Sequence, residues 1–428
     1  MIHALYRALT VLGGPLIGLY LKRRMARGKE DAARFAERLG RPGLARPEGR
    51  LVWLHAASVG ESLSLLTLVE RLAARPGWRV LMTTGTVTSA RLMAERLPPG
   101  ALHQYVPVDR PAFVRAFLDH WRPDLVLWAE SDFWPNMLDA IRRRAVPLVL
   151  VQGRVSAKSF AGWQRARGFI HRLLSGFTLC LGQTPEDAAR LAALGAKRVD
   201  CLGNLKMAIS PLPADEAELA RLRAATAGRP LWLAASTHPG EEAVAARVHR
   251  ALAARFPGLL TVIVPRHPHR GAEIRAELAA LGVAATLRSA GEAMDAAIHV
   301  ADTMGELGLF YRLSPIVLVG KSLPEAASGG GQNPFEPAQL GAAVLFGPRM
   351  DNFPGMAPAM LAAGAALQVA DAAALEQALA TLLSDPETLA RHRAAATAWA
   401  AGGAEALEAV LGILDPLLTE AEARHARP

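Results

Sequence analysis

The chain contains too few cysteines to build a disulfide framework. It has two, Cys180 and Cys201, among 428 residues, and their spacing matches no metal-ligand motif. Such scarcity is typical of a protein in a reducing compartment. Both cysteines lie in apolar, strand-like runs, which predicts that both thiols are buried.

Aromatic residues are also scarce, at 6% of the sequence, whereas the formal net charge is +9. An excess of positive charge indicates an anionic partner. Proteins that stack nucleic-acid bases interleave basic and aromatic side chains, and this chain has no such stretch. We therefore expect no nucleic-acid partner, and the charge favours a phosphorylated ligand or an acidic membrane surface.

Several sequence motifs of enzyme active sites are missing. The chain has no HExxH, no paired CxxC and no G-x-S-x-G motif. Residues 320–322 resemble the end of a Walker phosphate loop, but Pro315 occupies the position of its first glycine. These absences argue against the enzyme classes that those motifs mark.

No apolar run is long enough to span a bilayer, which takes roughly 20 residues. The apolar run at residues 8–21 is shorter and is followed by a cluster of five basic residues. Positive charge after such a run tends to keep that side in the cytoplasm. We predict that residues 1–30 form a membrane-associating segment, either a surface dock or an uncleaved anchor. A core helix is the alternative.

Strand-like runs alternate with helical stretches in both halves of the chain, which predicts α/β folding around parallel sheets. A charged helical piece at residues 210–228, with Pro211 and Pro213, interrupts the alternation. We therefore predict two Rossmann-like domains facing a cleft, residues 31–209 and residues 210–428, the second including the C-terminal helices. The predicted strands are 51–56, 79–84, 124–129, 147–152, 177–182, 198–202, 231–235, 259–264, 297–301, 315–320, 343–346 and 366–369.

The most informative stretch is LVWLHAASVGE at residues 51–61, where a buried strand leads through a small-residue turn into a helix that begins near Glu61. Ligands of open α/β sheets bind at the carboxyl edge of the strands, where this turn lies. Glu61 is thus a candidate functional carboxylate. It is also compatible with a structural role, as a first-turn carboxylate that offsets the helix dipole.

Other predicted strands of the first half also end in polar residues. Thr84 ends the second strand, and Glu130 and Asp132 follow the third. This acidic pair is compatible with a metal site, but we favour a structural or acceptor-binding role. Arg154 follows the next strand, where it is either an anion ligand or a solvated side chain. Lys206 closes the first domain, near the predicted cleft.

In the second half, Ser236 and Thr237 precede a helix with an acidic first turn. Small hydroxyl residues at this position form either a helix N-cap or a phosphate-binding site, and the sequence leaves both interpretations open. Arg266 and His267 follow the next strand and place cationic groups where a phosphate would lie.

A glycine loop follows, with Gly330 and Gly331, and leads through Asn333 into a helix that carries Glu336. Glycines let backbone amides approach a ligand. A carboxylate on a helix can accept two hydrogen bonds from ribose hydroxyls. Together with the other strand-end clusters, this loop predicts a nucleotide site that faces an acceptor site.

Seven ordered motifs resemble those of the 3-deoxy-D-manno-oct-2-ulosonic acid (Kdo) transferases of lipopolysaccharide assembly: LHAASVGE, ESDFWPN, GNLK, STHPGEE, VPRHP, DTMGELGLFY and GGQNPFEP with GPRMDNF. The resemblance implies a GT-B glycosyltransferase without a cofactor. It implies CMP-Kdo as donor, a lipid A precursor as acceptor, and an inverting transfer without a metal at the donor phosphate. It also implies a location on the cytoplasmic side of the inner membrane, peripheral or N-terminally anchored.

In that family the glutamate of the amino-terminal turn is the general base, which the resemblance places at Glu61. An inverting transfer needs such a base, and it needs cationic or N–H groups for the departing phosphate. We assign to the acceptor side Ser58, Gly60, Thr84, Glu130, Asp132 and Arg154. We assign to the donor side Lys206, Ser236, Thr237, Arg266, His267, Gly330, Gly331, Asn333 and Glu336.

The sequence departs from the family pattern at several positions. Asp132 stands where the family commonly has glutamate, Gln152-Gly153 where it has asparagine and alanine, and Gln332 where it has histidine. Residues 321–328 also differ from the short glycine-rich link that we expect. These departures concern acceptor preference more than the reaction. The alternatives are a GT-B enzyme for another nucleotide sugar and a non-catalytic lipid-binding paralogue.

Overall fold

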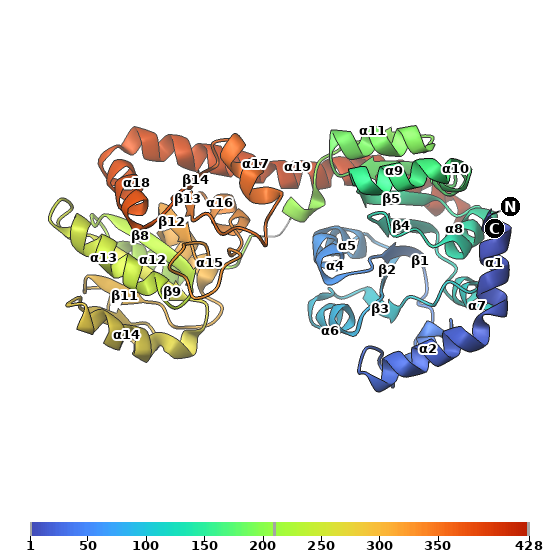
Figure 1. The fold of residues 1–428 in the computed structure, drawn as a ribbon, viewed down its shortest axis with the longest axis horizontal. Helices are drawn as coiled ribbons and strands as arrows, with labels where there is room; N and C mark the ends of the chain where they lie inside the picture. Colours follow the sequence, from blue (N-terminus) through green and yellow to red (C-terminus); the bar gives the residue numbers. More distant parts are fainter. Residues whose placement is uncertain (1, 209–210, 426–428) are drawn as a thin grey trace. The chain divides into compact units, whose positions relative to one another are not determined.

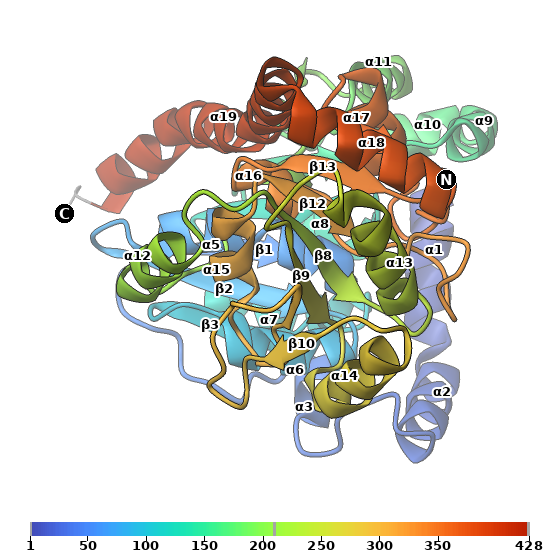
Figure 2. The same ribbon diagram turned by 90° about the vertical axis from the view of Figure 1, so that its left-hand side faces the viewer.

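The computed structural model describes residues 2–208 and 211–425, except for the side chain of Lys206. The chain divides into two compact units, Met1–Ile209 with Gly403–Pro428, and Ser210–Gly402. Each unit is built on one seven-stranded sheet with helices on both faces (Figures 1 and 2). Every strand pairing in the described residues is parallel, so the predicted α/β class is confirmed.

The sheet of the first unit has the strand order β3-β2-β1-β4-β5-β6-β7. The order reverses at β1, which pairs with β2 on one side and with β4 on the other. The carboxyl end of β1 therefore lies at the topological switch point, where open α/β sheets bind their ligands. The strands are β1 (Arg50–His55), β2 (Trp78–Thr84), β3 (Ala101–Tyr105), β4 (Leu125–Ala129), β5 (Leu148–Gly153), β6 (Leu179–Gly182) and β7 (Val199–Asp200).

Both faces of this sheet are buried, because its strands have apolar side chains on each side. In β1, Val52 and Leu54 pack into one core cluster, and Leu51 and Trp53 pack into the other. Continuous apolar runs of this kind are typical of parallel strands covered on both faces. The helices are α1 (Ile2–Leu12), α2 (Gly14–Ala26), α3 (Phe35–Arg38), α4 (Val59–Ser64), α5 (Leu66–Ala73), α6 (Val87–Arg96), α7 (Pro111–Trp121), α8 (Pro135–Arg143), α9 (Ala157–Arg165), α10 (Arg167–Leu174), α11 (Pro185–Leu194) and the 3₁₀ turn η1 (Leu205–Met207).

The second unit repeats this plan with the strand order β10-β11-β9-β8-β12-β13-β14, which reverses at β8. Its strands are β8 (Leu231–Thr237), β9 (Leu260–Pro265), β10 (Ala285–Leu287), β11 (Ile298–Val300), β12 (Ile316–Val319), β13 (Ala343–Phe346) and β14 (Ala366–Gln368). Its helices are α12 (Glu216–Ala225), α13 (Glu241–Ala253), the 3₁₀ turn η2 (Pro268–Arg270), α14 (Gly271–Ala280), α15 (Leu307–Leu313), α16 (Phe335–Gln339), α17 (Met356–Ala362), α18 (Ala372–Ser384) and the first part of α19 (Pro386–His425).

The last part of α19, from Gly403 onward, groups with the first unit, although the sequence placed all C-terminal helices in the second. Its apolar face joins the core beside β1 and β2 through Leu407, Val410 and Leu414. Polar contacts add to this packing, since Trp78 Nε1 donates to Glu422 Oε1 at 2.8 Å. Helical periodicity shows which face of a helix is apolar, but it does not show which sheet that face covers.

All the predicted strands are present, to within about two residues at each end. Two further strands were missed, β3 and β10, which are both edge strands. The sequence of β3, ALHQY, is not a continuous apolar run, and β10 is only three residues long. Of the two cysteines, Cys180 is buried in β6 but Cys201 is exposed, so the prediction of a buried thiol is wrong for Cys201. The chain leaves the sheet after Asp200, the last residue of β7.

The N-terminal helices α1 and α2 lie on the surface of the first unit (Figure 1). No single helix in the described residues is long and apolar enough to cross a membrane, and α1 with α2 reaches that length only as a pair bent by 64°. Only His3 of α1 and Leu21 of α2 are buried, so these helices are not core helices. Their exposed apolar side chains are Ile2, Leu5, Leu9, Val11, Leu12, Leu16, Leu19 and Tyr20.

Candidate functional site

Glu61 lies in the first turn of α4, directly after the carboxyl end of β1. Its two carboxylate oxygens each accept one hydrogen bond, Oε2 from Ala57 N at 2.8 Å and Oε1 from Ser58 Oγ at 2.7 Å. Ser58 is the N-cap of α4, so the pair forms a variant of the capping box. The carboxylate is thus held at the edge of the sheet, half-buried, with lone pairs left for a further donor.

The neighbouring strand β4 and the next strand, β5, bring other predicted acceptor-side residues to the same edge. Asp132 follows β4 and is exposed, and its carboxylate accepts a hydrogen bond from Trp134 Nε1 at 3.0 Å. Arg154 follows β5 with its side chain exposed, and its backbone N–H donates to Ser131 Oγ at 3.2 Å. In the part of the chain that the structure describes, no cluster of three His, Cys, Asp or Glu side chains is arranged to hold a metal ion.

Thr84 does not lie among the accessible residues of this edge. Its side chain is fully buried at the end of β2, and its Oγ1 lies 2.9 Å from His103 Nε2. A hydroxyl that is buried and already bonded cannot reach an acceptor, so we leave Thr84 out of the proposed site.

His55, the last residue of β1, lies directly before the turn that leads to Glu61, and sequence reasoning did not single it out. Its ring is completely buried against Trp128, with the ring centroids 4.3 Å apart, and its Nδ1 lies 3.0 Å from Thr83 Oγ1. Burial lowers the pKa of His55 to about 3, so the ring is neutral at physiological pH. A histidine inside an apolar strand gives no sequence signal that separates it from the core.

Strained backbone marks the same edge in both units. Four of the six non-glycine residues with positive φ in the described chain lie at the carboxyl ends of strands: Glu130 (φ 51°) after β4, Gln152 (φ 56°) in β5, Ser236 (φ 56°) in β8 and Lys321 (φ 60°) after β12. Left-handed non-glycine residues cost free energy and cluster at functional sites. This observation is independent of any motif, and it indicates a site at the carboxyl edge of each sheet.

In the second unit, the hydroxyls of the STHPGEE motif do not cap α13. The N-cap is Gly240, at φ 100°, and Thr237 Oγ1 instead donates to Glu242 Oε1 at 2.9 Å. Glu242 is fully buried, where it also accepts a hydrogen bond of 2.8 Å from Arg270 Nη1. Thr237 therefore supports a buried ion pair, whereas the side chain of Ser236 remains half-buried at the strand end.

Glu241 is a second residue that sequence reasoning missed. Its carboxylate, which is 1% exposed, accepts hydrogen bonds from four backbone N–H groups. It thereby ties the loop after β12 to the start of α13, and both segments carry predicted donor-side motifs. The donors are His238 N at 3.0 Å, Lys321 N at 2.7 Å, Ser322 N at 3.0 Å and Leu323 N at 3.2 Å.

Cationic groups gather beside this loop. Arg266 and His267 are exposed after β9, and the ring of His267 lies 5.9 Å from the ring of His238. Burial and the neighbouring charges of Lys321, His267 and Arg266 lower the pKa of His238. The local potential is therefore positive, which suits an anionic ligand. Lys206 lies in η1, but its side chain is outside the described part of the structure.

The glycine loop packs between the segments after β12 and β13. Gly331 N donates to Lys321 O at 2.9 Å, and Asn352 N donates to Gly330 O at 2.8 Å. Gly331 has φ 72°, a left-handed conformation that favours glycine, and a Cβ there would also displace the side chain of Met350, whose Sδ would lie 2.3 Å away. The loop is a defined structure that leads directly into α16.

Glu336 lies in the first turn of α16, and Asn333 Nδ2 donates to its Oε1 at 3.1 Å. Burial raises the pKa of Glu336 above its ordinary value. A carboxyl group with a raised pKa, fixed by one amide and half-buried beside a glycine loop, is typical of a ligand site.

Comparisons with known proteins agree with this architecture. A family model described as "3-Deoxy-D-manno-octulosonic-acid transferase (kdotransferase)" matches residues 33–209. The 3-deoxy-D-manno-octulosonic acid transferase of Bordetella pertussis is 37% identical to this chain over 421 residues, covering 94% of this chain and 96% of the relative.

Two solved structures are also similar. A crystal structure described as the C-terminal CMP-Kdo binding domain of WaaA from Acinetobacter baumannii is 31% identical and covers 42% of this chain and 94% of that chain, with a TM-score of 0.40. MurG from Acinetobacter baumannii is 14% identical and covers 85% of this chain and 99% of that chain, with a TM-score of 0.51. The likeness to MurG concerns the fold alone, and it confirms the predicted GT-B-like architecture.

Proposed function

This chain belongs to the 3-deoxy-D-manno-octulosonic acid (Kdo) transferase family, and we propose that it transfers Kdo from CMP-Kdo to a lipid A precursor with inversion at the anomeric carbon. Family membership makes the chain a CMP-Kdo-dependent glycosyltransferase. The acceptor, the stereochemical course and the roles of individual residues are our proposals. The observation that carries them is the fixed, half-buried carboxylate of Glu61 at the switch point of the first sheet.

We assign to Glu61 the role of general base. The acceptor hydroxyl oxygen forms a bond to the anomeric carbon of Kdo, the bond from that carbon to the CMP phosphate breaks, and Glu61 takes the hydroxyl proton. Its hydrogen bonds to Ala57 and Ser58 hold the carboxylate still while leaving lone pairs for the acceptor. Gly60 directly precedes Glu61, and a Cβ there would meet nothing within 4 Å apart from its chain neighbours and the backbone of its own helix.

In the second unit we assign the CMP ribose to Glu336 and the phosphate to the cationic side chains after β9. A carboxylate can accept two hydroxyl hydrogen bonds, and Asn333 orients the one on Glu336. Arg266 is exposed and supplies positive charge for the departing phosphate, and His267 is exposed beside it and offers a ring N–H as a hydrogen-bond donor. Gly330, Gly331 and Ser236 shape the surface beside them, whereas Thr237 acts through Glu242 and not on the ligand.

Binding of CMP is expected to depend on the ionisation of Glu336. Because burial raises the pKa of this carboxyl, it becomes protonated at a higher pH than an exposed glutamate. CMP affinity should therefore fall as the pH decreases from about 7.5 to about 5. Glu336→Gln should weaken CMP binding about tenfold at neutral pH and flatten this pH dependence. Isothermal titration with CMP measures both effects.

The matched control is Glu325→Gln, because Glu325 is exposed and lies on a neighbouring loop of the same unit. It should bind CMP like the parent protein at every pH. An unchanged CMP affinity in Glu336→Gln would contradict the assignment of the ribose site. If UDP stabilised the parent protein against heat more than CMP does, the assignment of CMP-Kdo as the donor would be wrong.

We also propose that the protein docks on the cytoplasmic face of the inner membrane through α1 and α2. The support is the row of exposed apolar side chains on these helices, followed by Lys22, Arg23 and Arg24 near the end of α2. Amphipathic helices with basic neighbours bind at the interface of anionic membranes. This location suits an enzyme whose acceptor is a lipid.

A further inference from the structure

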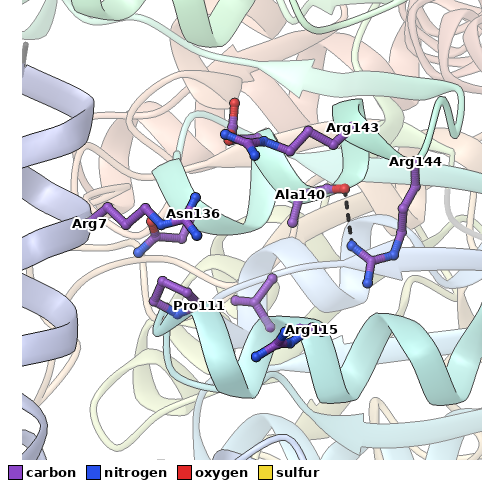
Figure 3. Close-up of a pocket in the computed structure, with 9 residues that line it drawn as sticks. Arg7, Pro111, Arg115, Asn136, Ala140, Arg143 and Arg144 are labelled. Atoms are coloured by element: carbon purple, nitrogen blue, oxygen red, sulfur yellow. Dashed lines mark hydrogen bonds and ion pairs between the residues drawn. The ribbon is translucent and has the colours of Figure 1, made fainter.

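A hollow of about 230 Å³ lies between α1, α7 and α8 of the first unit (Figure 3). Four arginines from these three helices line it: Arg7 from α1, Arg115 from α7, and Arg143 and Arg144 at the end of α8. None of them belongs to the segments that carry the proposed transfer chemistry. The hollow is smaller than the roughly 300–1,000 Å³ pockets that hold drug-sized ligands. Its size suits a small anion, not a nucleotide.

The wall that α1 contributes is fixed by hydrogen bonds to the rest of the unit. Tyr6 Oη donates a hydrogen bond to Asp109 Oδ2 at 3.0 Å. Asn136 Nδ2 donates one to Thr10 Oγ1 at 3.1 Å. Asn136 is 5% exposed, and it also donates to Asp109 O at 2.7 Å. Because these contacts hold α1 on both sides of Arg7, the hollow is preformed and does not depend on a ligand.

The charge inside the hollow is not balanced by the acids around it. Asp139 is the one carboxylate among the lining residues, and Arg143 Nε donates to it at 2.7 Å. Burial alone would raise the pKa of Asp139, but hydrogen bonds from Arg142, Arg172 and Arg143 outweigh it and lower the pKa to about 2. The carboxylate of Asp139 is thus already shared among three guanidinium groups.

The remaining arginines differ in their partners. Arg144 Nη2 donates to Asp119 Oδ1 at 2.5 Å, on the exposed side of α7. The guanidinium groups of Arg7 and Arg115 have no hydrogen-bond or ion-pair partner among residues 2–208 and 211–425. Figure 3 shows Arg7 reaching toward Asn136 from one side of the hollow and Arg115 lying on the opposite wall, below α8. Two uncompensated guanidinium groups therefore line one small preformed hollow.

We propose that this hollow binds a phosphate group, with room inside it for at most a small organic substituent such as glycerol. Guanidinium forks match phosphate oxygens and bind them through charge-assisted hydrogen bonds. The phosphate comes either from a soluble phosphate ester or from the headgroup of an anionic phospholipid beside α1. None of the residues that line it is among those assigned to the donor or the acceptor, and the proposal stands whether or not the proposed transfer is correct.

The test compares three variants with the parent protein. Arg7→Gln with Arg115→Gln removes both free guanidinium groups, while Arg91→Gln with Arg96→Gln removes two exposed arginines of α6 as the matched charge control. Ala140→Leu fills the hollow without changing the charge, because Ala140 lines it from α8. Each protein is titrated with sn-glycerol 3-phosphate by calorimetry. Each is also sedimented with vesicles of phosphatidylcholine alone or with about 30% phosphatidylglycerol.

We expect the parent and the α6 control to bind glycerol 3-phosphate, and both hollow variants to bind it at least about tenfold more weakly. If the hollow variants also lose the extra binding caused by phosphatidylglycerol, the lipid headgroup is the source. If that extra binding is unchanged, the source is a soluble phosphate ester.

Three results would overturn the proposal: no glycerol 3-phosphate binding by the parent, parent-like binding by Ala140→Leu, or parent-like binding by Arg7→Gln with Arg115→Gln. The second result would mean that diffuse surface charge, not the hollow, attracts the anion. Failure of the parent to bind either type of vesicle would contradict only the docking of α1 and α2. The calorimetric titration would still show whether the hollow binds glycerol 3-phosphate.

Discussion

Replacing Glu61 by glutamine is expected to slow Kdo transfer by about 10²–10⁴-fold, the usual contribution of a general base. A glutamine side chain keeps the size of the glutamate, and its one oxygen can still accept a hydrogen bond from Ala57 N or Ser58 Oγ. The helix cap is therefore weakened but not lost. CMP affinity should be unchanged, because Glu61 lies outside the second unit, which carries most of the assigned donor-side residues.

The structural role of Glu61 predicts a different result. If the carboxylate only caps α4, then Glu61→Gln should lower the melting temperature slightly and leave the transfer rate near that of the parent. Glu70→Gln is the matched control, since Glu70 is exposed on the adjacent helix α5. Steady-state rates with saturating donor, measured beside thermal unfolding, separate the two roles.

Glu241→Ala is expected to cause the largest loss of stability, about 3–5 kcal/mol for the unfolding of the second unit. The substitution leaves the backbone N–H groups of His238, Lys321, Ser322 and Leu323 without their acceptor in a buried environment. The loop after β12 should then detach from α13. Because the glycine loop packs on Lys321, CMP binding should be lost together with the stability.

Glu325→Ala is the control for that substitution, because Glu325 lies on the loop after β12 that Glu241 holds but is exposed. Chemical denaturation followed by circular dichroism measures the loss. A change below about 1 kcal/mol in Glu241→Ala would mean that water or another group replaces the carboxylate. That result would contradict the role of Glu241 as the link between the two segments.

Most of the sheet architecture was predictable from the sequence, because parallel strands buried on both faces are continuous apolar runs. The edge strand β3 was missed because edge strands need not be apolar throughout, as His103 and Gln104 show. The sequence also did not predict that the last part of α19 packs in the first unit. An amphipathic helix can cover either sheet, and only the contacts of Leu407 and Val410 identify the sheet of the first unit.

Where a polar residue follows a strand, as at Glu61 and Asp132, the sequence predicted its position at the sheet edge, and the roles of these residues stay proposals. The candidate site was not predictable where function depends on which partner a side chain selects. The sequence predicted Thr84 and Thr237 as strand-end hydroxyls that face a ligand. In the structure both are buried, Thr84 bonded to His103 and Thr237 bonded to Glu242. Conversely, Glu241 reads as an ordinary first-turn acid, and only the fold brings the four N–H groups to it.

The measurement that tests the central claim most directly is a mass-resolved transfer assay with CMP-Kdo and a lipid A precursor. Parent protein and Glu61→Gln are assayed side by side, with and without EDTA. We predict that the parent adds Kdo in both conditions, that the glutamine variant adds almost none, and that the mass of the product gives the number of sugars. Transfer by both proteins would contradict the role of Glu61. No transfer by a parent protein that still binds CMP would contradict the proposed acceptor.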